Sequence, residues 1–100
     1  MGEVLQSLMT ERVLSQGLMV GRLARGWVEV VGERLAEESA PARLEAGTLT
    51  VSATSGGWGA QLQFLARDVR DRANRALGSD AVKRVRVVVD REASERPKPL

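Results

Sequence analysis

The hydrophobic period of the chain changes near residue 42, and this change limits the possible folds more than any other feature. Up to about residue 37, apolar residues recur at spacings of three and four, whereas residues 48–54 alternate between polar and apolar. The first spacing indicates an amphipathic helix, and the alternation indicates a strand with one buried face. A helical spacing and a second alternation then follow. The order predicts an α+β domain in which helices cover one face of a small sheet.

Two helices are expected before the change of period. Residues 3–15 show a short helical pattern with an expected end near Gly17, and a longer helix is expected over residues 18–37. Trp27 belongs to the apolar stripe of the second helix, which places it in the core. Gly32 also lies in this helix, where glycine costs about 1 kcal/mol relative to alanine. We therefore expect Gly32 to permit close packing.

The next segment predicts a β-hairpin. Pro41 ends the preceding helix, since proline disfavours helical geometry in the residue before it. Residues 43–45 lead into a turn at Gly47, and residues 48–54 follow as a half-buried strand.

A third helix is expected from Trp58 to about residue 77, with Gly78 at its end, and residues 82–89 form the last strand. The predicted order is α-α-β-β-α-β with a three-stranded sheet, and the helical crossover allows the last strand to run parallel to its neighbour. The length suits one domain, which we place at residues 1–90. Residues 91–100 contain two prolines and hardly any apolar side chains, so they are expected to form a disordered tail.

The composition excludes much of enzyme chemistry. The chain has no cysteine, histidine or tyrosine, which excludes thiol nucleophiles, cysteine-bound zinc and the commonest general base. Glu29, Glu33 and Glu37 form an acidic row, which is expected to be a solvated helix face. We therefore expect no enzyme, cofactor, metal or small-molecule substrate. The chain also lacks a signal segment and an apolar run long enough to cross a membrane, which favours a cytoplasmic location without a membrane partner.

Positive charge is concentrated in the second half of the chain. Residues 51–100 carry ten basic and six acidic side chains, against five and seven in residues 1–50. The third helix and the last strand supply donors suited to phosphate oxygens. These candidate nucleic-acid contacts are Gln63, Arg67, Arg70, Asn74, Lys83, Arg84 and Arg86. The alternative is a solvated face with Arg67–Asp71 and Asp68–Arg72 ion pairs.

The glycine-rich run at residues 56–59 and two aromatic side chains leave alternatives open. Residues 56–59 either cradle a phosphate or form a plain strand-to-helix turn. Phe64 lies away from the apolar stripe of its helix, so it either packs under the first helices or is exposed to a partner. Trp58 lies in that stripe, with one ring edge as a candidate partner contact. Aromatic residues make up only 3% of the chain, which leaves little for base stacking and favours phosphate contacts.

Several segments, in this order and spacing, resemble the DciA family of bacterial replicative-helicase operators. The segments are residues 27–32, Ala36, 39–41, 44–51, Trp58, 62–65, 74–78 and 82–85. The resemblance implies a KH-like domain that contacts a DnaB-type hexameric helicase and single-stranded or forked DNA, without ATPase activity, at the nucleoid. It also implies that Trp27, Gly32, Pro41, Gly47 and Gly78 are structural positions.

Two departures from the family pattern stand out. Glu38 replaces a histidine that is common in the family, and only about ten residues follow the last expected strand, where many members carry a long basic extension. Two other functions remain open at this point. One is a KH-like RNA-binding module, and the other is a protein-interaction domain without nucleic-acid binding.

Overall fold

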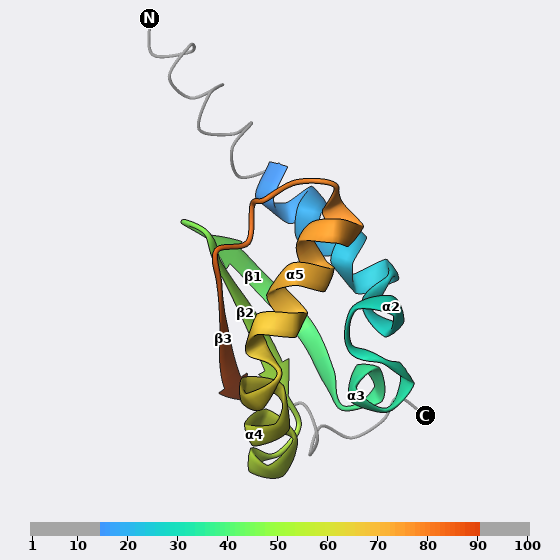
Figure 1. Ribbon diagram of the computed structural model, residues 1–100. Helices are drawn as coiled ribbons and strands as arrows, with labels where there is room; N and C mark the ends of the chain where they lie inside the picture. Colours follow the sequence, from blue (N-terminus) through green and yellow to red (C-terminus); the bar gives the residue numbers. More distant parts are fainter. Residues whose placement is uncertain (1–14, 91–100) are drawn as a thin grey trace, which may run out of the picture.

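The computed structural model describes residues 15–90. Almost all of the helix expected over residues 3–15, and all of the tail expected over 91–100, lie outside this range. Within it, helices precede a β-hairpin, and a helical crossover then leads to a third strand (Figure 1). This arrangement confirms the predicted α+β class and its three-stranded sheet.

The first described helix covers residues 15–25 and continues through Gly17, so the predicted end at Gly17 is wrong. Leu23 is fully buried, and Met19 and Val20 pack against the core. Burial of this apolar face outweighs the roughly 1 kcal/mol that a helical glycine costs.

The long helix predicted over residues 18–37 is divided. Two short helices, α2 (Trp27–Val31) and α3 (Glu33–Glu37), follow the first one. Gly32 separates them with a φ of 92° and a ψ of 161°, a conformation that costs other residues strain. A Cβ atom added at Gly32 would meet nothing within 4 Å. Gly32 therefore permits a sharp change of direction, and the close packing predicted for it is absent.

The hairpin consists of β1 (Ser39–Glu45) and β2 (Thr48–Ala53), which pair antiparallel. Its turn places Ala46 and Gly47 at φ values of 50° and 80°, as in the two-residue turns that match strand twist. β1 begins at Ser39, earlier than the sequence predicts, and contains buried Pro41 next to a register shift. An edge strand tolerates proline because the missing N–H need not face a partner strand.

The crossover from β2 contains α4 (Gly56–Phe64) and α5 (Ala66–Leu77), and it ends in β3 (Arg84–Val89). The single helix predicted from Trp58 is thus divided at Leu65. Gly78 ends α5 in the left-handed region with a φ of 65°, as the sequence predicts. β3 pairs parallel to β2, which gives the strand order β1-β2-β3.

The core lies between the central strand and the helices. Leu49, Val51 and Ala53 of β2 are at most 1% exposed. Gly59 brings α4 close to the sheet, because a Cβ atom there would lie 3.3 Å from Cγ2 of Val89. The helices, β1 and the segment before β3 contribute the other buried side chains, which are Leu23, Trp27, Val30, Leu35, Leu44, Leu62, Val69, Ala73, Leu77 and Val82.

Candidate nucleic-acid interface

A basic groove of about 550 Å³ runs between the α4–α5 junction and the start of β3. The residues that line this basic groove are Gln63, Phe64, Ala66, Arg67, Arg70, Lys83, Arg84 and Val85. It therefore brings together five of the seven predicted nucleic-acid contacts. The sequence predicts these five residues from helical spacing and local charge. It does not predict that Ala66 and Val85 also line the groove, because their position depends on the tertiary fold.

The fold fixes both sides of the basic groove. On one side, the chain changes direction at Leu65, so that the last turn of α4 and the first turns of α5 face β3. On the other side, the backbone N–H groups of Lys83 and Arg84 both donate to the carbonyl oxygen of Gly47, at 2.7 and 3.1 Å. The hairpin turn thus holds the start of β3 in place.

The cations of the basic groove differ in their protein contacts. No ion pair or side-chain hydrogen bond within residues 15–90 involves Arg67 or Arg84, and both side chains are exposed. Arg70 contacts Asp71, with both Nε and Nη2 at 3.0 Å from Oδ1. The Arg67–Asp71 and Asp68–Arg72 pairs of the alternative interpretation are absent from the described part of the chain. Arg67 and Arg84 are therefore available to an anionic ligand.

Lys83 has an acidic neighbour outside the groove lining. Its Nζ donates to Oδ2 of Asp80 at 3.2 Å, and this hydrogen bond, with the charge of Lys83, lowers the pKa of Asp80. The Asp80 side chain is 95% exposed, so the pair is screened by solvent and adds little to stability. No carboxylate lines the basic groove itself, which leaves the groove electropositive.

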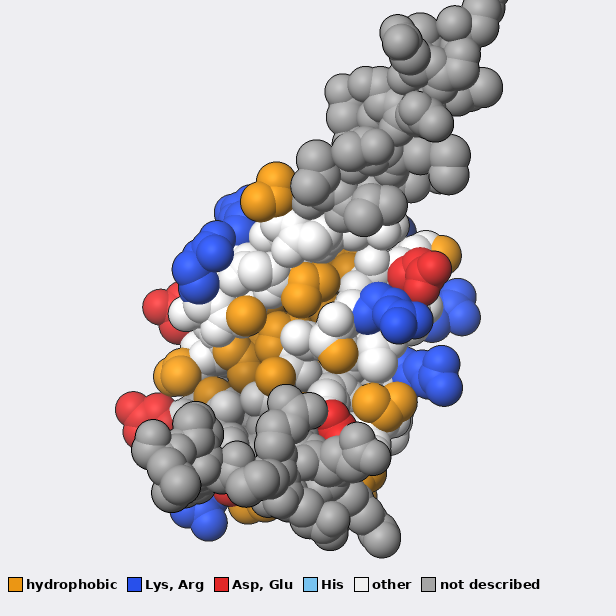
Figure 2. Space-filling view, turned by 180° about the vertical axis from the view of Figure 1, so that it is seen from behind, with side chains coloured by type: hydrophobic (Ala, Val, Ile, Leu, Met, Phe, Trp, Pro, Cys, Tyr) orange, Lys and Arg blue, Asp and Glu red, His pale blue; other side chains and the backbone are white. Residues whose placement is uncertain are grey.

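Seen from behind, the molecule carries several Lys and Arg side chains along the edge that holds β3, at the right of Figure 2. Arg86 belongs to this edge: it lies two residues after Arg84 on β3 and is exposed, but it does not line the groove. Hydrophobic side chains occupy the middle of the same view. Positive charge is thus present along the border of the sheet at β3, and further Lys and Arg side chains lie at the left of the same view.

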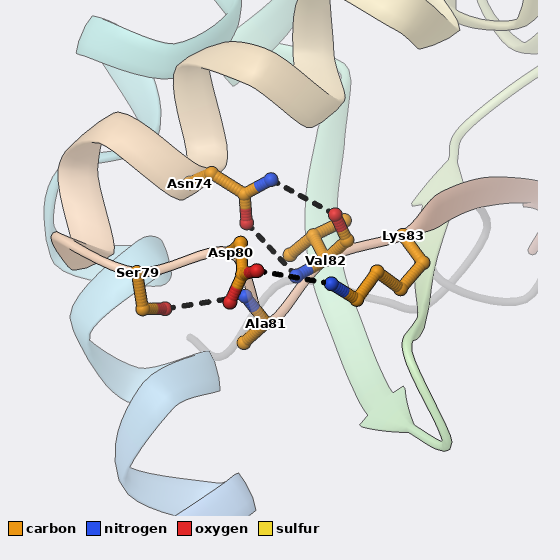
Figure 3. A network of polar contacts seen from close by, with 6 residues as sticks. All are labelled: Asn74, Ser79, Asp80, Ala81, Val82 and Lys83. Atoms are coloured by element: carbon orange, nitrogen blue, oxygen red, sulfur yellow. Dashed lines mark hydrogen bonds and ion pairs between the residues drawn. The ribbon is translucent and has the colours of Figure 1, made fainter.

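Asn74 does not join the other predicted contacts. Its Nδ2 donates to the carbonyl oxygen of Val82 at 2.9 Å, and its Oδ1 accepts from the N–H of Val82 at 2.8 Å (Figure 3). Val82 is 1% exposed. The Asn74 amide therefore pairs the buried backbone N–H and C=O groups of Val82 and connects α5 to the segment just before β3.

The structure resolves the alternatives for Phe64. This side chain is 88% exposed and lines the basic groove, so packing under the first helices is excluded. Trp58 differs, because it is half-buried against the core. The guanidinium of Arg34 lies 5.4 Å from the centroid of the Trp58 ring, a contact that sequence spacing does not reveal.

The glycine-rich run forms the first turn of α4. Ser55 is the N-cap residue, and its Oγ accepts from the N–H of Trp58 at 3.3 Å. Gly59 packs against β3. The run thus forms a strand-to-helix turn, and it lies outside the basic groove.

No group of three acidic side chains within residues 15–90 could hold a metal ion. None of the helices described there is both long and apolar enough to cross a membrane.

Comparison with known proteins identifies a family. Residues 1–87 match the family described as "Dna[CI] antecedent, DciA". The chain is 36% identical to a UPF0232 protein of Rhodococcus jostii over 74 residues, which are 74% of this chain and 37% of the relative. A UPF0232 protein of Streptomyces avermitilis is 34% identical over 89 residues, or 87% of this chain and 49% of the relative.

A third relative is a UPF0232 protein of Mycobacterium tuberculosis, which is 28% identical over 99 residues, or 99% of this chain and 53% of the relative. The chain thus spans about half or less of the length of these three relatives.

Proposed function

The chain belongs to the DciA family, and we propose that it is a bacterial replication factor that binds a DnaB-type replicative helicase together with DNA. In this proposal the domain docks on the helicase and holds single-stranded or forked DNA nearby, which assists helicase loading. The factor itself has no ATPase activity. Family membership supports the helicase partner.

One structural observation supports DNA as the second partner. Four cationic side chains from separate elements, Arg67 and Arg70 on α5 and Lys83 and Arg84 at β3, line one groove that contains no carboxylate. Arginine guanidinium groups form bidentate contacts with phosphate oxygens. A groove with this lining suits a sugar–phosphate backbone, and its contacts are independent of sequence.

The helicase partner is tested by size-exclusion chromatography with the DnaB-type helicase of the same organism. A full-length family member serves as the positive control. We expect this chain to elute in one peak with the helicase. If the control co-elutes and this chain does not, the proposed helicase contact of this domain is wrong.

The DNA partner is tested by fluorescence anisotropy of a labelled single-stranded oligonucleotide between low and moderate salt. For up to four phosphate contacts, log Kobs should fall against log salt with a slope of roughly −2 to −3. Absence of binding at low salt would contradict the proposal. An unlabelled RNA of equal sequence that competes much better than DNA would favour the RNA-binding alternative.

A further inference from the structure

We propose that Phe64 stacks against an unpaired base, so that the basic groove takes single-stranded DNA in preference to duplex DNA. This inference rests on the proposed DNA binding and adds which form of DNA is bound and by which contact. It also departs from the expectation from composition, which gave base stacking little weight.

The first observation is the exposure of Phe64. At 88%, it is the most exposed large hydrophobic side chain of residues 15–90, ahead of Leu18 at 67% and Val28 at 51%. The ring contributes almost nothing to the core. Its exposure therefore has no explanation in packing.

The second observation is that a fixed backbone holds Phe64. It is the last residue of α4, between fully buried Leu62 and half-buried Leu65. The N–H of Leu65 donates to the carbonyl oxygen of Gln61 at 3.1 Å, which closes the last turn of α4. A ligand that stacks on the ring thus meets a ring whose backbone is already ordered, and this lowers the entropy cost of binding.

The third observation is the chemistry around the ring. Phe64 lies in the basic groove beside Gln63, and Arg67 follows three residues later across the bend. A nucleotide of a single strand can place its base on the ring and its phosphate at the Arg67 guanidinium. The Gln63 amide offers both a donor and an acceptor to a base edge.

These neighbours favour a nucleic acid over a protein for the Phe64 contact. An apolar protein partner has no need of cations in the same groove as the ring, whereas a nucleotide carries both a flat aromatic face and a negative charge. In a duplex the base faces are covered by neighbouring pairs, so only an unpaired base offers its face to Phe64.

The test compares three oligonucleotides of equal length by anisotropy: a thymidine single strand, a duplex, and a single strand of abasic sites. The abasic strand keeps the phosphates and lacks the bases. Stacking on one aromatic side chain is worth about fivefold or more in affinity. We expect the wild-type chain to bind the thymidine strand at least about fivefold more tightly than the abasic strand.

Three variants assign this difference to the ring. Phe64→Ala should abolish the preference for the thymidine strand and leave the salt slope unchanged, because no charge is removed. Phe64→Leu keeps an apolar side chain without an aromatic face and should lose most of the preference. Val28→Ala, also exposed but absent from the groove lining, should behave as wild type. Thermal unfolding checks that each variant is folded.

The outcomes separate this inference from the proposed function. Equal binding of thymidine and abasic strands by the wild type, or an equal loss for both strands in Phe64→Ala, would overturn stacking while DNA binding stands. Loss of helicase co-elution in Phe64→Ala with unchanged DNA affinity would assign the ring to a protein contact and also overturn stacking. Absence of salt-dependent binding to every oligonucleotide would overturn the DNA proposal itself.

Discussion

Replacement of Asn74 by alanine should destabilise the fold strongly while sparing the chemistry of the basic groove. The Asn74 amide makes two hydrogen bonds, of 2.9 and 2.8 Å, with the C=O and N–H of Val82. Val82 is 1% exposed, so water cannot readily replace the lost partner. Each unpaired buried backbone group costs about 1–3 kcal/mol.

The two orphaned groups together predict a loss of roughly 2–6 kcal/mol in the free energy of unfolding. A domain of this size is stable by roughly 5–15 kcal/mol, so the Asn74→Ala variant should remain folded at low temperature. Urea unfolding followed by circular dichroism measures the loss directly. Tryptophan fluorescence gives a second signal, since Trp27 is buried.

Gln63→Ala is the matched control. Gln63 is exposed on α4 and makes no side-chain hydrogen bond with any residue between 15 and 90, so its loss should change stability by less than about 0.5 kcal/mol. Gln63 lines the basic groove, so this variant should weaken DNA binding. If Asn74→Ala loses less than about 0.5 kcal/mol yet weakens DNA binding, Asn74 is a nucleic-acid contact and our interpretation of its hydrogen bonds is wrong.

Three further predictions concern glycines and pH. Gly59→Val should destabilise the fold by about 1–3 kcal/mol through contact with β3. Gly57→Ala should be neutral or slightly stabilising in the same thermal unfolding assay, because its new Cβ would meet only Oγ of Ser55, at an ordinary contact distance of 3.9 Å. Gly47→Ala should lower the free energy of unfolding in urea more than Gly78→Ala does. Both glycines carry a left-handed φ, worth about 1–2 kcal/mol of strain for alanine, but only at Gly47 would the new Cβ lie 2.9 Å from Cγ of Lys83. Equal losses in the two variants would contradict this packing argument. DNA affinity should be constant from about pH 6 to 7.5, because the chain has no histidine. The pKa of Asp80 is lowered, so its small stabilising contribution is present above the unfolded pKa near 3.9 and is lost only as the pH falls through the folded value. A change of affinity near neutral pH would therefore contradict the assignment of the DNA contacts to arginine and lysine side chains.

The sequence predicts the strands and the class of the fold well, because alternation is a local signal. Leu49, Val51 and Ala53 alternate with polar residues, and all three are buried in the central strand. The divisions of the helices are less predictable. The sequence pattern around Gly32 is that of a continuous helix. Only the structure shows that the φ of Gly32 is positive and that the helix is divided there.

The candidate site shows a similar limit. Helical spacing aligns Asn74 with Arg67 and Arg70, and local charge marks the face. Spacing cannot show that the segment after α5 returns to Asn74 and takes up its amide. Nor can it show that Phe64 lies in the same groove as the cations, since the groove forms only when β3 reaches the α4–α5 junction.

The claim that the basic groove binds DNA is tested most directly by the salt dependence of affinity in two charge-matched double variants. Arg67→Gln with Arg84→Gln removes two cations from the groove, and Arg22→Gln with Arg25→Gln removes two exposed cations of the first described helix, outside the groove lining. With a single-stranded oligonucleotide, the groove variant should reduce the slope of log Kobs against log salt by up to about 1.4, because each lost phosphate contact removes about 0.7. The control variant should retain the wild-type slope. An unchanged slope in the groove variant, or an equal reduction in both, would contradict the assignment of the groove as the DNA-binding surface.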